Sequence, residues 1–134
     1  MYLGPQRKRN RWFGYDYKSP GLYFVTICVK DRLELLGSVN QSFVKLNDIG
    51  GIIRQQWLWL EENYKYIKLD RWIIMPNHLH GIIKINNKKY FGKKVGNGRD
   101  RSLHIKPLHQ IIGAFKTTSS KLIHQYQNNF HFAW

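Results

Sequence analysis

Alternation of hydrophobic and polar positions predicts strands in the first third of the chain. The tripeptide Ser-Pro-Gly at residues 19–21 has the composition of a turn. β-Branched and aromatic residues dominate the segment LYFVTICVKDR that follows, which predicts a strand over about residues 22–30. A turn near Gly37 and a weaker strand over residues 42–46 then indicate a hairpin.

Spacings of three and four residues predict a helix over the next segment. Asn47 can cap its amino end, because an asparagine side chain accepts hydrogen bonds from the N–H groups of a first turn. Apolar residues then follow helical spacing at Ile49, Ile52, Ile53, Trp57 and Leu60. We expect this helix to end near Asn63.

The pattern returns to alternation after this helix. The segment that begins at Tyr66 has apolar residues at Ile67, Leu69 and Ile73, which alternate with polar or aromatic neighbours. This alternation predicts a strand that ends at Met75. The segment HLHGIIKIN follows at once as another strand. The two are expected to be antiparallel and joined by a turn at Pro76-Asn77.

A second helix is predicted near the end of the chain, because Pro107 suits the first turn of a helix. The buried stripe of this helix is expected to hold Leu108, Ile111, Ile112, Phe115, Ser119, Leu122 and Tyr126. His109 and Lys116 share a different face. The tail FHFAW is expected to begin a last strand.

The elements follow a β-α-β-β-α-β order. This order predicts an α+β ferredoxin-like sandwich, with an antiparallel sheet of four to five strands and two main helices on one face. A length of 134 residues suits one domain, so residues 1–134 are assigned to a single domain.

Charge narrows the expected partners. The chain has 22 Lys and Arg against 8 Asp and Glu, a formal net charge of +14. Such an excess attracts polyanions, with an affinity that falls as salt rises. Binding to a membrane surface would need a helix with a basic face opposite an apolar one, and neither predicted helix has that pattern. Nucleic acid is therefore the expected partner, and no membrane is expected.

Several basic residues are candidates for DNA contacts. Residues 1–20 are predicted to be a basic and aromatic arm, in which Arg7, Arg9 and Arg11 could contact phosphates or base edges. Lys116 is a further candidate, because it lies off the core stripe of its helix. Residues 86–105 are predicted to be a basic loop. Each of these charges is equally compatible with a solvated surface.

Cysteine content and hydropathy bear on the compartment. The single cysteine, Cys28, lies in the apolar run YFVTICV and is interpreted as a buried small hydrophobe. The basic amino terminus has no apolar stretch typical of a signal peptide, and no apolar run approaches the ~18–20 residues of a membrane span. These features predict a cytoplasmic protein.

The clearest chemical pattern is the pair His78 and His80. Residues two apart on a strand point to the same face, so two imidazoles are expected side by side, with Leu79 in the opposite layer. A neutral imidazole is a common ligand for divalent metals. The pair predicts a divalent metal site, for Mg²⁺ or more favourably Mn²⁺, because Mg²⁺ prefers oxygen ligands. The alternative is one core histidine and one exposed histidine.

The sequence does not identify a third ligand. The candidates are Asn77, His104, His109 and Gln110. Asn77 suits the turn better, and no spacing supports the others. A structural zinc site is disfavoured, because one cysteine and two close histidines do not close a tetrahedral shell.

Longer segments resemble a known family. The run IIMPNHLHGII resembles the histidine–hydrophobe–histidine (HUH) motif of single-tyrosine transposases, in particular the REP-associated tyrosine transposases. RKRNRWFGYDYKSPGLYFVTICVKDR is similar to the amino-terminal signature and first strand of that family. HQIIGAFKTTSSKLI is similar to the helix before its catalytic segment. Together these segments cover nearly the whole chain in the expected order.

The resemblance implies an endonuclease and strand transferase of DNA transposition, acting on single-stranded or hairpin DNA. A metal held by His78 and His80 would polarise the scissile phosphate. A tyrosine would attack that phosphate, forming a 5′-phosphotyrosine link and freeing a 3′-OH. The resemblance is also compatible with a homodimer.

The sequence departs from the family at its end. The family's nucleophilic tyrosine, with a further metal ligand near it, follows a segment like FHFAW, where this chain ends. We therefore expect a truncated or decayed copy without its nucleophile. Tyr126 is interpreted as core, Tyr23, Tyr64 and Tyr66 as structural, and Tyr90 has no spacing in its favour. The alternative function is a non-catalytic nucleic-acid-binding module on the same fold.

Overall fold

The computed structural model describes residues 17, 19–86, 105–128 and 132–134. Most of the predicted amino-terminal arm and of the predicted basic loop lies outside these ranges. The candidate residues that fall outside them are Arg7, Arg9, Arg11, Tyr90 and His104.

Three antiparallel strands form the main sheet. They are β1 (Gly21–Cys28), β5 (His78–Ile85) and β4 (Ile67–Met75), in the order β1-β5-β4. β5 therefore lies in the centre and pairs along both edges. The predicted turn at Pro76-Asn77 joins β4 to β5.

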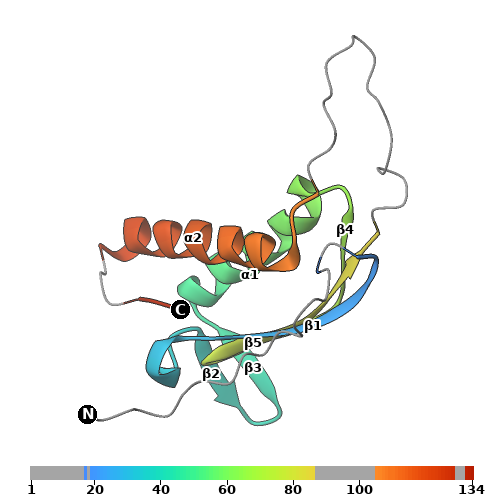
Figure 1. The fold of residues 1–134 in the computed structure, drawn as a ribbon. Helices are drawn as coiled ribbons and strands as arrows, with labels where there is room; N and C mark the ends of the chain where they lie inside the picture. Colours follow the sequence, from blue (N-terminus) through green and yellow to red (C-terminus); the bar gives the residue numbers. More distant parts are fainter. Residues whose placement is uncertain (1–16, 18, 87–104, 129–131) are drawn as a thin grey trace, which may run out of the picture.

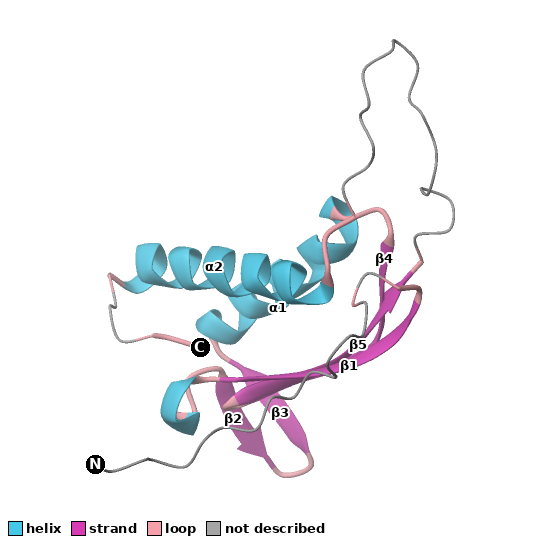
Figure 2. Cartoon of the chain, viewed as in Figure 1, coloured by secondary structure: helices cyan, strands magenta, loops and turns pink. Residues whose placement is uncertain are grey.

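Two helices cover the same face of this sheet (Figure 1). They are α1 (Asp48–Asn63) and α2 (Leu108–Gln127). Asn47 caps α1 as predicted, since its Oδ1 accepts a hydrogen bond of 2.9 Å from the Gly50 N–H. Neither helix, nor any other in the described ranges, is long and apolar enough to cross a membrane. The helical layer above the strands (Figure 2) is the α+β sandwich predicted from the sequence.

The remaining strands, β2 (Gly37–Asn40) and β3 (Phe43–Leu46), form a separate two-stranded sheet. The hairpin was predicted, but a turn near Gly37 is wrong, because Gly37 pairs with Leu46 and the chain reverses at residues 41–42. A β-carbon on Gly37 would lie 2.3 Å from the Lys45 carbonyl oxygen. Glycine here permits close approach of two strands, and Gln41 takes the positive φ of the turn.

The stripe predicted on α2 is correct at its start and wrong at its end. Phe115 and Ser119 are buried, whereas Leu122 and Tyr126 are 37% and 55% exposed and Ile123 is buried instead. The buried positions of α2 recur at every fourth residue. Such a row of side chains is inclined to the helix axis, so it winds around the helix where the helix crosses its neighbour. The buried row therefore moves away from residues 122 and 126.

The last described residues lie against α2 and the end of β1. Phe132 is buried, the Trp134 ring centroid is 5.5 Å from that of Phe115, and the Trp134 Nε1–H donates to Ser119 Oγ at 3.0 Å. The Lys30 N–H donates to the Ala133 carbonyl at 2.9 Å. The predicted strand is not formed at residues 132–134.

Trp57 connects α1 to the centre of the sheet. Its side chain is fully buried, and its ring meets Phe115 edge-on with centroids 5.5 Å apart. On the sheet side it faces Gly81 of β5, where an added β-carbon would lie 2.5 Å from Trp57 Cζ2. The absence of a side chain at Gly81 therefore sets how closely α1 approaches β5.

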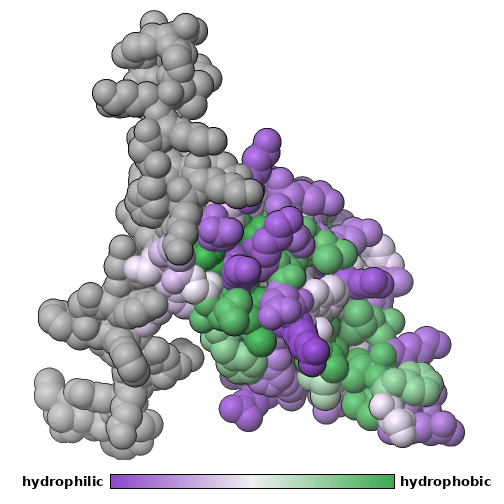
Figure 3. Space-filling view, turned by 90° about the vertical axis from the view of Figure 1, so that its right-hand side faces the viewer, coloured by the Kyte–Doolittle hydropathy of each residue, from purple (hydrophilic) through white to green (hydrophobic). Residues whose placement is uncertain are grey.

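On the surface, hydrophobic side chains are exposed between hydrophilic ones, as the side view in Figure 3 shows.

We expect Gly81→Ala to destabilise the protein by about 1–3 kcal/mol, because the added methyl group overpacks the contact with Trp57. Gly113→Ala is the matched control, since a β-carbon there meets nothing within 4 Å. Replacing a helical glycine by alanine should instead stabilise by about 0.5–1 kcal/mol. Urea denaturation of both variants measures the difference. Equal stability of Gly81→Ala and the wild type would contradict the close contact.

Candidate metal and nucleic-acid site

β5 directs alternate side chains to opposite faces of the sheet. Leu79, Gly81 and Ile83 are buried beneath the helices. His78 and His80 lie on the other, open face and are partly buried. Their ring centroids are 4.4 Å apart, and the rings meet at 76°. The prediction that the two imidazoles lie side by side is confirmed, while their role as metal ligands stays a prediction.

The pairing with β1 completes a small pocket around these rings. Thr26 lies opposite His80, and Cys28 lies opposite His78. The pocket has a volume of about 300 Å³. We call it the histidine pocket, and its lining residues are Thr26, Cys28, Arg32, Asn77, His78 and His80.

Asn77 determines which nitrogen of His78 is available. The Asn77 Nδ2 donates to the Arg32 carbonyl at 3.4 Å, which orients the amide so that its Oδ1 faces His78. That oxygen can only accept, so the His78 Nδ1 at 2.6 Å must carry the proton and donate. The lone pair of His78 therefore resides on Nε2, the nitrogen that could bind a metal.

Thr26 has the corresponding role at His80. Its Oγ1 is 2.9 Å from His80 Nδ1. A threonine hydroxyl can donate or accept, so this contact alone fits either tautomer. A metal on Nε2 selects the tautomer in which Nδ1–H donates to Oγ1, the usual arrangement for a ligating histidine. Both rings thus have a polar partner on Nδ1 that supports metal binding through Nε2.

Arg32 brings a fixed positive charge to the pocket. It ends the short 3₁₀ turn η1 (Lys30–Arg32), where Asp31 and Arg32 have φ angles of 58° and 52°. The left-handed region is unfavourable for residues with a β-carbon. Hydrogen bonds hold both backbone groups of Arg32: its N–H donates to the Val29 carbonyl, and its carbonyl accepts from the Asn77 Nδ2. The backbone is therefore held in a conformation that places a guanidinium beside the histidines.

These neighbours also keep His78 neutral. Burial lowers the pKa of His78 from its usual 6.5, and the charges of His80 and Arg32 lower it further. A neutral imidazole is the form that binds metals. The environment of His78 thus favours its ligand form at neutral pH.

The donor set fits a metal with open coordination positions. Two imidazole nitrogens suit Mn²⁺, Co²⁺ or Zn²⁺ better than Mg²⁺. Among the described residues, no group of three or more His, Cys, Asp or Glu side chains is placed to hold a metal. Two histidines would leave the other positions for water and phosphate oxygens. A closed structural zinc shell needs four protein ligands, and the described residues offer no such group.

Cys28 is exposed and lines the histidine pocket, so its interpretation as a buried hydrophobe is wrong. Along β1 the inward positions are those of Tyr23 and Ile27, and Cys28 shares the outward face with Thr26. An apolar run alone does not fix which of its members face the core, since side chains alternate along a strand.

The other candidate ligands and cations lie elsewhere. His109 and Lys116 are exposed on α2 and line a groove of about 550 Å³ between α2 and β1. They share a face as predicted, but this face is not part of the histidine pocket. Gln110 is exposed on the same helix and does not line the histidine pocket either. Asn77 serves His78 and the turn.

No tyrosine among the described residues lines the histidine pocket. The Tyr23 hydroxyl donates to the Ser19 carbonyl, and the Tyr66 hydroxyl accepts from the Lys106 N–H, so both are structural as expected. Tyr126 is not a core residue. Its exposed hydroxyl donates to Asp48 Oδ2 at 2.6 Å, and that hydrogen bond and the carboxylate charge raise the pKa of Tyr126. The phenolate needed for attack is thereby disfavoured.

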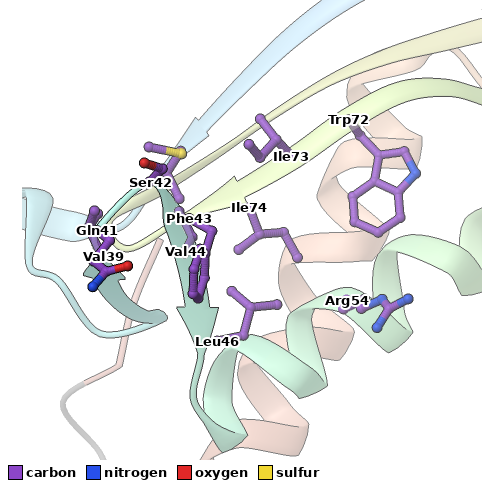
Figure 4. A pocket seen from close by; sticks show the side chains of 11 residues that line it. Val39, Gln41, Ser42, Phe43, Val44, Leu46, Arg54, Trp72, Ile73 and Ile74 are labelled. Atoms are coloured by element: carbon purple, nitrogen blue, oxygen red, sulfur yellow. The ribbon is translucent and has the colours of Figure 1, made fainter.

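A second pocket, of about 600 Å³, lies between the β2–β3 hairpin and β4 (Figure 4). Its walls are mainly apolar, including Phe43, Leu46 and Ile74, with the Arg54 guanidinium nearby. It holds no histidine, cysteine or carboxylate and offers no evident catalytic chemistry.

Sequence reasoning missed Thr26 and Arg32. Thr26 could have been found from the alternation of β1 once the register with β5 was known, because it faces the same way as Cys28. Arg32 carried no signal, because its position depends on a 3₁₀ turn with unusual φ angles. Both contribute to the pocket through tertiary contacts.

Comparison with known proteins adds one relative. No family model matches the sequence. The chain is similar to a protein of Haemophilus influenzae described as uncharacterized, with 40% identity over 79 residues. This match covers 59% of the chain and 44% of the relative, so the chain spans less than half the length of that protein.

We expect the His78 imidazole to titrate below 6.5 in an NMR pH titration of the histidine ring protons. Arg32→Gln should raise its midpoint, because removing a positive charge favours the protonated ring. The midpoint of His78 should rise only in part, because burial and the charge of His80 still lower its pKa. Arg54→Gln, in the second pocket, is the matched control and should leave the midpoint unchanged. The same midpoint in Arg32→Gln and wild type would contradict the contribution of Arg32.

Proposed function

We propose that this chain is a single-stranded DNA-binding domain of the HUH single-tyrosine transposase type, which binds a DNA phosphate at a divalent metal held by His78 and His80. The observation that carries the proposal is the orientation of the two rings. Each ring has a polar partner at Nδ1, Asn77 for His78 and Thr26 for His80, so Nε2 is the nitrogen of each ring that a metal could bind. A formal net charge of +14 supports a polyanionic ligand.

The chain's own residues would bind and orient the phosphate. His78 and His80 would hold the metal, which when bound would polarise a phosphate oxygen as a Lewis acid. Arg32 would pair with another phosphate oxygen, because its guanidinium lines the same pocket and favours anionic oxygens. Asn77 and Thr26 would keep the imidazoles oriented, as hydrogen-bond partners of ligating histidines do.

The attacking group of this chemistry is not among the described residues. Strand cleavage through a 5′-phosphotyrosine link needs a tyrosine near the phosphate, and no described tyrosine lines the histidine pocket. The proposal therefore assigns to these residues the binding and polarisation of the phosphate, and assigns the nucleophile to none of them.

We expect Mn²⁺ to stabilise the wild type against thermal unfolding and to lose this effect in His78→Ala and in His80→Ala. At about 100 times Kd, a bound metal adds about 2.7 kcal/mol to the stability. Each variant loses one of two nitrogen ligands, so we expect Mn²⁺ affinity to fall by at least about 100-fold, beyond the 10–100-fold typical of hydrogen-bond partners of ligands.

His109→Ala is the matched control for this measurement, because His109 is an exposed histidine outside the histidine pocket. Mn²⁺ should stabilise His109→Ala against thermal unfolding as much as it stabilises the wild type. If His78→Ala and the wild type are stabilised equally by Mn²⁺, the metal binds elsewhere and the proposal fails.

We expect Tyr126→Phe to leave DNA chemistry unchanged, because the Tyr126 hydroxyl is bound to Asp48 and its pKa is raised. The measurement incubates the chain with labelled hairpin DNA and Mn²⁺ and separates covalent protein–DNA adducts on a denaturing gel. Any adduct of the wild type should persist in Tyr126→Phe and vanish in His80→Ala. Loss of the adduct in Tyr126→Phe would make Tyr126 the nucleophile.

A non-catalytic nucleic-acid-binding module is the second candidate. It is favoured by exposed hydrophobic side chains on the open sheet face, Leu22 and Phe24 of β1. Such a module would bind single-stranded DNA equally well with Mn²⁺ and with EDTA. The first proposal instead requires Mn²⁺ to strengthen binding in the wild type and not in His78→Ala.

A further inference from the structure

An exposed phenylalanine lies next to the histidine pair on the open face of the sheet. Phe24 is 69% exposed, and its β1 neighbour on this face, Leu22, is 63% exposed. Phe24 lies opposite Ile82 of β5, two pairs along from the Thr26–His80 pair and therefore next to it on the same face. Large hydrophobic side chains grouped on a solvent-facing sheet suggest a bound partner rather than a folding requirement.

Phe24 also contacts the site directly. Its ring is stacked against that of His80, with centroids 5.6 Å apart and an angle of 24° between the planes. His80 thus has Thr26 at Nδ1 and an aromatic ring at its side. With most of its surface exposed, Phe24 keeps a flat apolar face for another planar group.

The surrounding charges indicate what that group belongs to. Described cations border this face: Lys84 pairs with Leu22 across the strands, Arg32 lines the histidine pocket, and Lys116 lines the groove that Phe24 also lines. A ligand that matches this face therefore carries negative charges and flat apolar groups in alternation. Single-stranded nucleic acid has this chemistry, because its phosphates alternate with unpaired bases that stack on aromatic side chains.

We propose that Phe24 is a stacking platform for a base of single-stranded DNA whose neighbouring phosphate lies in the histidine pocket. This inference rests on the proposed function, because it places the base relative to that phosphate. The Phe24 and His80 ring centroids are 5.6 Å apart, so a base stacked on Phe24 would lie beside the pocket that holds the phosphate. A base adjacent to the bound phosphate is therefore within reach of Phe24.

The platform would select single strands over duplex. In a duplex each base is already stacked and paired, so its face is not available to a side chain on the protein surface. An unpaired base has a free face for Phe24. This preference for single-stranded DNA would arise beside the histidine pocket, where the strand must be unpaired for its phosphate to enter.

The test measures the affinity of the full chain for a fluorescently labelled single-stranded dT12 oligonucleotide with Mn²⁺. Phe24→Ala should weaken binding by about 5- to 150-fold, the range expected for loss of one base–aromatic stack. Phe24→Trp should restore binding, and Phe24→Leu should not, because leucine is apolar but has no ring. Phe43→Ala is the matched control, since Phe43 is a similarly exposed phenylalanine, 61%, outside the histidine pocket.

A scan with single abasic sites gives a readout that a general structural defect would not change. In the wild type, removing one particular base should weaken binding as much as Phe24→Ala does. In Phe24→Ala, removal of that same base should have no further effect. If every abasic position weakens both proteins alike, Phe24 does not stack on a base and the inference is overturned.

Three further outcomes distinguish failure of this inference from failure of the proposed function. If Mn²⁺ binding and DNA binding are lost in His78→Ala while Phe24→Ala binds DNA like the wild type, the proposed function stands and the platform is overturned. If the wild type does not bind the oligonucleotide at all, the proposed function itself fails. If Phe24→Ala converts a dimer to a monomer in light scattering without changing DNA affinity, the patch binds a second copy and the inference is overturned.

Discussion

Strand β5 is hydrogen-bonded along both edges and covered on one face, so each of its side chains has only two directions available. Leu79 and Gly81 point toward the helices, and Trp57 occupies the space that Gly81 leaves. A slip of one residue in the pairing would place Leu79 in solvent and both imidazoles in the core. The burial of one face of β5 therefore holds His78 and His80 on the other.

The fine geometry of the site depends on Asn77. Its backbone carbonyl accepts from the Val29 N–H, its Nδ2 donates to the Arg32 carbonyl, and its Oδ1 accepts from His78. One residue of a tight turn thus connects the end of β1, the η1 turn and the first histidine. Because of these connections, the tautomer of His78 and the position of Arg32 are determined together, which is useful in a site that would bind both a metal and an anion.

The histidine pair and its arrangement were predictable, because they depend on the two-residue period of one strand. The cap at Asn47 and the turn at Pro76-Asn77 were also predictable, since the relevant interactions are local in sequence. The errors at Tyr126 and Cys28 have a different origin. Whether either side chain is buried depends on how its element crosses or faces a distant one, and periodicity does not contain that information.

The sequence by itself determined the order of the two helices and of the strands of the main sheet, the positive charge and the presence of two imidazoles on one face of a strand. Only the tertiary structure decided what surrounds those imidazoles. Thr26 is 54 residues from His80 and Asn77 is 45 residues from Arg32, and these pairs meet because β1 and β5 are neighbours in the sheet. Local periodicity specifies the direction of a side chain, whereas its partners follow from strand pairing between distant segments.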